Sequence, residues 1–170
     1  MTRIDPVVRI GSIGRVRRRA WLLVGAAGGG VVLMMGCAGA PKVASVSGSI
    51  QAAADLNPSV SQRPSPLTVR VYELRSAVGF NQADFMSLFQ AEQATLGAEV
   101  LGREEFILQP GESRPYNKQL NAETRFIGVF AAYRNLERAR WRAVVAVAPG
   151  RAQKLAIRAE SLAISALVQP

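Results

Sequence analysis

Polar and apolar residues alternate over several short segments of this chain, which is the pattern of β-strands with one buried face. Residues 45–52 place Val46 and Ile50 on one face and serines on the other, and residues 67–74 alternate in the same way. Residues 126–133 are apolar on both faces, as in a central strand that is covered on each side. Further strands are predicted at 105–108, 114–120, 140–147, 153–159 and 162–167.

Two Pro-Gly dipeptides separate some of these strands. Pro110-Gly111 suits the two central positions of a type II turn. Residues 105–108 and 114–120 on its two sides are therefore predicted to form a hairpin. Pro149-Gly150 predicts another turn between later strands.

The spacing of apolar residues becomes helical between residues 81 and 97. Asn81 is placed to cap the first turn, with Asp84 in the capping-box position, and Gly97 ends the apolar repeat. We expect one short helix here. Its stripe of Phe85, Leu88 and Phe89 is predicted to pack on the strands, with a partner-docking helix as the alternative.

Seven or eight short strands with one helical insertion predict an all-β fold, a two-sheet β-sandwich. We expect residues 45–170 to form it as one domain, with the helical insertion at about 81–97. The chain has a single cysteine, so no internal disulfide can stabilise this domain, and core packing must do so.

The chain begins with the layout of a lipoprotein export signal. A basic region rich in arginine precedes an apolar run that ends at Gly36, and Cys37 follows. The residues around Cys37 resemble the bacterial lipobox, so residues 1–36 are predicted to be a signal peptide and residues 37–44 a lipidated tether. Ala38, where retained lipoproteins carry aspartate, implies sorting to the outer membrane. Arg18-Arg19 leaves the twin-arginine export route open beside the Sec route. The alternative to a lipobox is an ordinary signal-peptidase cleavage site at residues 38–40, with Cys37 not acylated.

Most of the positive charge belongs to this signal. Of the overall net charge of +9, residues 37–170 carry 15 Lys+Arg and 11 Asp+Glu, which is 15 − 11 = +4. The strongly basic composition is therefore no argument for a nucleic-acid partner, and none is expected.

Hydrolytic chemistry is not expected, because the chain contains no histidine. Ser-His-Asp and Cys-His arrangements and nearly all zinc sites need an imidazole. Glu104 and Glu105 are adjacent on a predicted strand, so they face opposite ways and cannot act as a paired acid and base. The alternating arginines 138, 140 and 142 could meet phosphate, lipid headgroups or an acidic partner. No catalytic residue, cofactor or metal is predicted.

Five blocks of sequence occur in an order that resembles one protein family. They are LNP at 56–58, RPSPLTVRVYEL at 63–74, FNQADF at 80–85, LGREEF at 101–106 and RARWR at 138–142. Together with the lipobox they resemble the TssJ lipoproteins of the bacterial type VI secretion system. The resemblance implies a transthyretin-like sandwich and a structural role rather than an enzymatic one.

The resemblance also implies a location and partners. Such lipoproteins are held at the periplasmic face of the outer membrane by the acyl chains on the cysteine, here Cys37. They bind the periplasmic C-terminal domain of TssM within a complex that contains TssJ, TssL and TssM.

In this family the loop between the first two strands binds the partner, which here is the proline-rich segment 56–66. The residues expected to contribute are Leu56, Asn57, Pro58, Ser59, Val60, Ser61, Gln62, Arg63 and Pro64. Prolines restrict the loop, so it loses less entropy on docking. Asn57, Gln62 and Arg63 are expected to offer hydrogen bonds, and replacing residues 57–62 with a Gly/Ser linker is expected to spare stability.

Two other classes of protein remain open from the residues alone. The first is a generic periplasmic lipoprotein whose sandwich binds a small ligand or sugar, which needs exposed aromatic side chains. Tyr116 is the only tyrosine outside a clearly buried pattern, and Trp141 is expected in the core. The second is a pilot lipoprotein that escorts a secretin, for which a more helical chain is usual.

Overall fold

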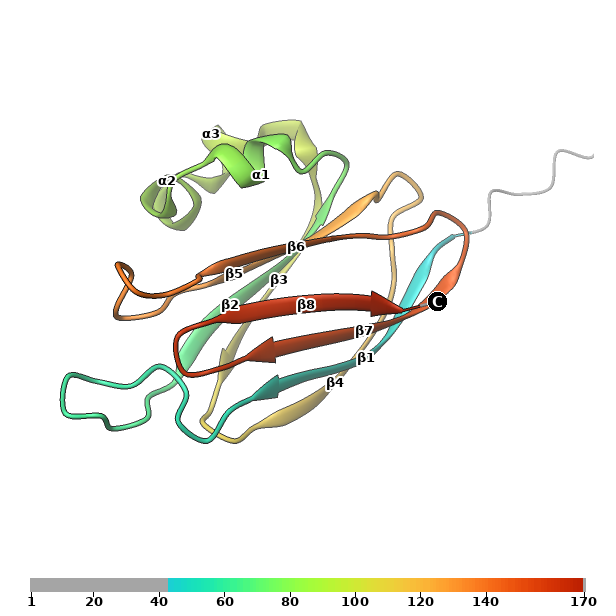
Figure 1. Ribbon diagram of the computed structural model, residues 1–170. Coiled ribbons are helices and arrows are strands. Elements are labelled where there is room, and N and C mark those ends of the chain that lie inside the picture. The colour runs from blue at the N-terminus through green and yellow to red at the C-terminus, as the bar shows by residue number, and fades with distance from the viewer. Residues whose placement is uncertain (1–42, 170) are drawn as a thin grey trace, which may run out of the picture. The chain divides into compact units, whose positions relative to one another are not determined.

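The computed structural model describes residues 43–169, which form two four-stranded β-sheets packed face to face (Figure 1). One sheet has the strand order β4-β1-β7-β8 and the other β3-β2-β5-β6. The strands are β1 Ser45–Ala52, β2 Leu67–Leu74, β3 Val100–Leu108, β4 Ser113–Gln119, β5 Phe126–Ala131, β6 Arg142–Ala146, β7 Ala152–Ala159 and β8 Ile164–Gln169. The prediction of a two-sheet sandwich is confirmed.

The alternating pattern gave the bounds of β1 and β2 correctly. In β1, Val46 and Ile50 are buried between the sheets while Ser47 and Gln51 are exposed. β1 pairs with β4 in the antiparallel sense and with β7 in the parallel sense. The main core fills the space between the sheets and includes Leu67 and Val69 of β2.

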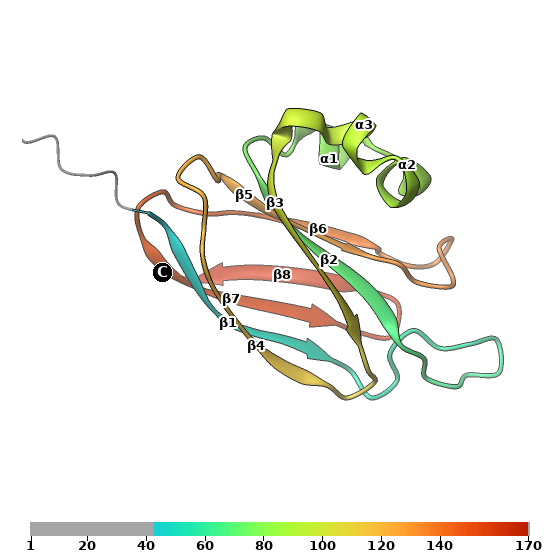
Figure 2. The same ribbon diagram turned by 180° about the vertical axis from the view of Figure 1, so that it is seen from behind.

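A second apolar cluster covers the outer face of the sheet that contains β2. Tyr72 and Leu74 lie on this face and are fully buried beneath Phe80 and Leu88 of the helical insertion. Figure 2 shows these helices above β2 and β5. The predicted packing of the helical stripe on the strands is therefore confirmed, and β5, with five buried residues of six, is covered on both faces as expected.

The predicted single helix is in fact three short helices. They are α1 Val78–Gln82, α2 Phe85–Gln90 and α3 Glu92–Leu96, followed by a 3₁₀ turn, η1, at Gly97–Glu99. Asn81 lies inside α1, and Asp84 is the N-cap of α2, where its carboxylate accepts hydrogen bonds from the Ser87 backbone at 2.9 Å and hydroxyl at 2.6 Å. Extended backbone at Asp84 separates the two helices, because an N-cap residue cannot itself be helical.

Arginines of the sheet hold these short helices in place. Arg142 of β6 donates to the carbonyls of Phe80 and Ala83 at the end of α1, at 3.0 and 2.7 Å. Arg70 of β2 donates to the carbonyls of Leu88 and Phe89 in α2. Helix C-termini leave such carbonyls without partners, so these contacts stabilise the insertion. The sequence predicts that arginines 138, 140 and 142 could together meet a phosphate, lipid headgroups or an acidic partner. For Arg142 this prediction is wrong, because its guanidinium is bonded to the carbonyls of α1.

The predicted hairpin of residues 105–108 and 114–120 is wrong. The turn itself forms, with Gly111 at φ 76° and a hydrogen bond from Glu112 N to Gln109 O at 3.0 Å. However, β3 pairs with β2 and β4 pairs with β1, so the turn connects the two sheets instead of neighbours in one sheet. Alternation reveals which side chains face the core, but it does not reveal which sheet receives a strand.

An ion-pair cluster joins the sheets between the edge strands β3 and β4. Lys118 Nζ lies 2.8 Å from Glu73 Oε1 and 2.7 Å from Glu104 Oε1. Glu73 is only 5% exposed, and its other oxygen accepts from Asn121 N at 2.7 Å and Thr124 Oγ1 at 3.0 Å. Burial alone would raise the pKa of Glu73, but these hydrogen bonds hold that pKa below its ordinary value.

Replacing Glu73 with glutamine should destabilise the sandwich by about 2 kcal/mol at neutral pH, because a buried charged hydrogen-bond network is lost. Since the pKa of Glu73 is lowered by folding, its contribution is complete above the unfolded-state pKa and disappears as the pH falls through the folded-state value. When urea unfolding is measured from pH 7 to about pH 3, the free energies of unfolding of the two proteins should approach each other as the solution becomes acidic. Asp55→Asn, at an exposed carboxylate, is the control. A difference in unfolding free energy between the unchanged protein and the Glu73 variant that stays constant across this pH range would contradict the account.

Candidate functional site

Three connections gather at one end of the sandwich, opposite the end where β1 begins and β8 finishes (Figures 1 and 2). They are the β1–β2 loop, the β5–β6 loop and the β7–β8 turn. The arrangement follows from strand direction, because β7 runs parallel to β1 while β2 and β5 are antiparallel to each other. The predicted partner-binding loop is thus one of three neighbouring segments.

Asn57 links all three of these connections. Its side-chain amide donates to Pro66 O at 2.8 Å within the β1–β2 loop, and its side-chain oxygen accepts from Arg134 N of the β5–β6 loop at 2.9 Å. Its backbone N–H donates to Ser161 O of the β7–β8 turn at 3.0 Å. Asn57 is 2% exposed and adopts φ 47°, a conformation that asparagine tolerates better than most residues.

The sequence predicts that Asn57 bonds to a partner, but its side chain is almost fully buried and both its amide and its oxygen already hold internal partners, which favours a structural role. Leu56, also predicted as a contact residue, is fully buried in the core. The base of the loop is closed by a hydrogen bond from Ser65 N to Leu56 O at 2.9 Å. Replacing residues 57–62 as a block would therefore damage the fold, contrary to the sequence-based expectation.

The tip of the loop, residues 58–63, has a fixed backbone of its own. Ser59 N donates to Arg63 O at 2.8 Å, Gln62 N donates to Ser59 O at 2.9 Å, and the Ser59 hydroxyl accepts from Arg63 N at 3.2 Å. Val60 stands at the apex with its side chain fully exposed, at 103% of the reference area. An apolar side chain held outward on a rigid turn is ready to enter a partner's surface without a large entropy loss.

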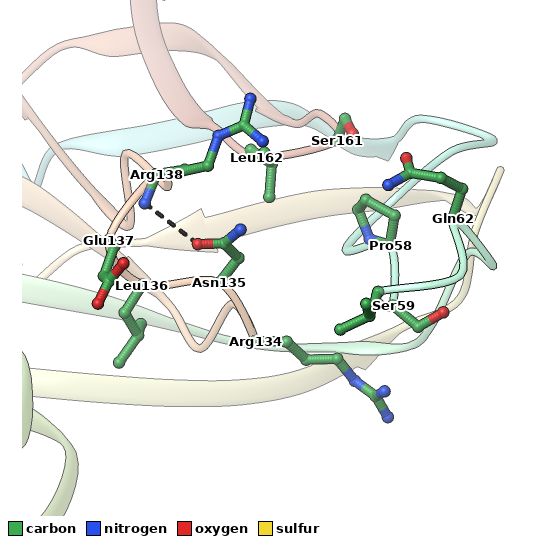
Figure 3. A pocket seen from close by; sticks show the side chains of 11 residues that line it. Pro58, Ser59, Gln62, Arg134, Asn135, Leu136, Glu137, Arg138, Ser161 and Leu162 are labelled. Carbon is green, nitrogen blue, oxygen red and sulfur yellow. Dashed lines mark hydrogen bonds between the residues drawn. The ribbon is translucent and has the colours of Figure 1, made fainter.

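A groove of about 1030 Å³ lies between the loop tip and the other two connections (Figure 3). Of the predicted loop residues, Pro58, Ser59, Val60 and Gln62 line it, while Ser61, Arg63 and Pro64 are exposed but outside the lining. The remaining lining residues are Arg134, Asn135, Leu136, Glu137, Arg138, Ser161 and Leu162. Of these, sequence reasoning singled out only Arg138, as part of a basic row.

The two further walls of the groove are braced by buried contacts. Tyr133 is 2% exposed, and its hydroxyl donates to Glu160 O at 3.0 Å, which joins the β5–β6 loop to the β7–β8 turn. Arg140 N donates to Leu162 O at 2.9 Å, and Ile164 N donates to Arg140 O. The groove is therefore a built feature of the fold.

The other residues considered from the sequence have structural roles. Glu104 pairs with Lys118, while Glu105 on the opposite face pairs with Arg70 and Arg103. Trp141 packs edge-on against Phe85 and Phe130. Within the described residues, no helix is long and apolar enough to cross a membrane. Cys37 lies outside the residues that the structure describes.

Exposed aromatics of the kind that a sugar-binding site needs are missing from the groove lining. Tyr116 was expected to be the accessible tyrosine, but it is buried at 6% exposure against Phe106. Burial raises the pKa of Tyr116 to about 12. The lining of this groove therefore does not support the sugar-binding alternative.

The fold and the groove define a class of small two-sheet β-sandwich proteins with a groove at the end where three loops meet. The family model for type VI secretion lipoproteins, which names VasD, EvfM and TssJ, matches residues 44–162. The chain belongs to this family of type VI secretion lipoproteins. The resemblance seen in the five sequence blocks is thereby confirmed.

Solved structures of similar chains agree with this assignment. The T6SS lipoprotein TssJ1 from Pseudomonas aeruginosa is 38% identical, with 75% of this chain and 98% of that chain covered and a TM-score of 0.72. Lip from Serratia marcescens, a membrane-bound component of the type VI secretion system, is 27% identical, with coverage of 72% and 96% and a TM-score of 0.66.

More distant structures share the fold alone. A chain from a structure of the T6SS protein TssM C-terminal domain from EAEC is 23% identical, with 74% of this chain and 98% of that chain covered and a TM-score of 0.58. No match was found among curated protein sequences.

Changing Asn57 to alanine should loosen the three connections together and lower the free energy of unfolding by about 2–3 kcal/mol, because two partners lose their hydrogen bonds in a buried place. Hydrogen exchange should quicken at the Arg134 amide. Ser61→Ala, at the exposed tip, is the control. Unchanged exchange at Arg134 in the Asn57 variant would show that Asn57 does not hold the loops.

Proposed function

We propose that this chain is the outer-membrane lipoprotein of a type VI secretion membrane complex, and that its β1–β2 loop binds the periplasmic C-terminal domain of TssM. TssL would be the third member of that complex. The observation that carries the proposal is the rigid, fully exposed loop tip around Val60 in a chain of this family. The distant likeness to a chain from the TssM C-terminal domain structure suggests the partner to test.

Anchoring would depend on Cys37. In this proposal residues 1–36 are removed as a signal peptide, and the new N-terminal cysteine carries the acyl chains. One acyl chain holds a protein only reversibly, while two or more give a firm anchor, since each buried methylene contributes about 0.8 kcal/mol. The protein would then stay at the periplasmic face of the outer membrane and serve as a structural tether.

The direction of β1 fits this role. The strand begins at Ser45, close in sequence to Cys37, and leads to the loop end of the sandwich. A strand of eight residues spans roughly 25 Å at 3.3 Å per residue. The loop would therefore face away from the membrane, where a periplasmic partner can reach it.

Replacing Ser59–Gln62 with a four-residue Gly/Ser segment, with Asn57 kept, should abolish binding of the TssM domain and leave the unfolding transition within about 0.5 kcal/mol. A single change, Val60→Asp, should weaken binding at least about tenfold, because burial of a valine contributes roughly 1.5–3 kcal/mol. Residues Gly39–Pro170 form a compact unit of their own and suit calorimetry of this kind.

Val78→Asp is the matched control, since Val78 is an exposed valine on α1. It should bind as the unchanged protein does. Full affinity in the Ser59–Gln62 replacement would refute the assignment of the loop as the binding element.

A Cys37→Ser variant should lose acylation and leave the membrane fraction, because no other lipid anchor is proposed for the chain. Metabolic labelling with a fatty acid, followed by membrane fractionation in high salt, measures both effects. Ser45→Ala serves as the control. Retention of label on the Cys37 variant would contradict the proposed anchor.

A further inference from the structure

The groove beside the loop tip offers both apolar and charged surface to an incoming segment. Pro58, Val60, Leu136 and Leu162 supply its apolar lining. Its volume of about 1030 Å³ slightly exceeds the roughly 300–1,000 Å³ typical of small-molecule pockets. A groove of this size with walls from three connections suits a length of polypeptide.

The charges of the groove are not neutralised within the described part of the chain. Arg134 and Arg138 are exposed, and neither forms an ion pair there, whereas Arg70, Arg75 and Arg103 each do. Glu137 lies between the two arginines in sequence but pairs with neither. Figure 3 shows the side chains of Arg134 and Arg138 extending in different directions, with Glu137 set apart from both.

The positions of these arginines are fixed even though their side chains are free. Arg134 N is held by Asn57 Oδ1, and Arg138 N donates to Asn135 Oδ1 at 3.3 Å. A guanidinium on a fixed backbone can form a bidentate pair with a carboxylate at a reduced entropic cost. The neighbouring polar side chains of Gln62 and Ser161 can bond to a segment's backbone.

We propose that the groove receives an extended acidic segment of the partner, with one large apolar side chain against Leu136 and Leu162 and carboxylates paired with Arg134 and Arg138. This inference rests on the proposed function and specifies the partner surface that the loop tip meets. The loop tip and the groove are then two parts of one interface: Val60 enters the partner, and the partner's acidic segment enters the groove.

The test is calorimetric binding of Gly39–Pro170 to the periplasmic C-terminal domain of TssM at 50 and 300 mM NaCl. The double change Arg134→Glu and Arg138→Glu should raise the Kd at least tenfold at 50 mM NaCl. It should also remove most of the salt dependence seen with the unchanged protein, because exposed charge pairs are screened by salt. The thermal transition should be unchanged, since neither side chain makes an internal ion pair.

The matched control is Arg151→Glu with Lys154→Glu, which makes the same change in net charge at two exposed positions near the start of β7, whereas the groove lies beyond the end of that strand. It should leave the Kd within twofold. If both charge-reversed proteins lose affinity equally, the effect is one of net charge, and the acidic-segment proposal is overturned.

The outcome also separates this inference from the proposed function. If Val60→Asp abolishes binding while the Arg134 and Arg138 changes leave the Kd within twofold, the loop function stands and the acidic segment is refuted. If the unchanged protein does not bind the TssM domain at either salt concentration, both proposals fail.

Discussion

The loop end of this protein depends on one buried side chain, Asn57. Its two side-chain hydrogen bonds and its backbone N–H join the β1–β2 loop to the β5–β6 loop and the β7–β8 turn. Because a buried amide that loses its partners is costly, the three connections are held in one arrangement. Together with the hydrogen bond from Tyr133 to the β7–β8 turn, this closed base holds the groove beside Val60 in a fixed form.

The remainder of the domain supplies a stiff support for that end. One sheet carries the helical insertion on its outer face, where Arg70 and Arg142 complete the helix ends. The Lys118 cluster ties the two sheets together between β3 and β4. With no disulfide available, stability comes from this core and these buried polar contacts, while the proposed docking surface consists of a few exposed residues.

Local sequence patterns predicted local features well and tertiary pairings poorly. Alternation gave the bounds of β1 and β2, and Gly97 ends the helical segment as expected with φ 48°. The interruption at Asp84 was missed because an N-cap and a capping-box residue look alike in sequence. The role of Asn57 was also missed, since its bond to Arg134 joins residues 77 positions apart. No short-range pattern could reveal that the β5–β6 loop and the β7–β8 turn form the rest of the groove.

The central claim is that the three-loop end binds the periplasmic domain of TssM, and hydrogen exchange of the complex tests it most directly. Adding that domain should slow amide exchange at residues 59–63, 134–138 and 161–162 together, while exchange in α1–α3, β1 and β7 stays unchanged. Slower exchange in the helical insertion or in β1 and β7, with exchange in the three loops unchanged, would contradict the account.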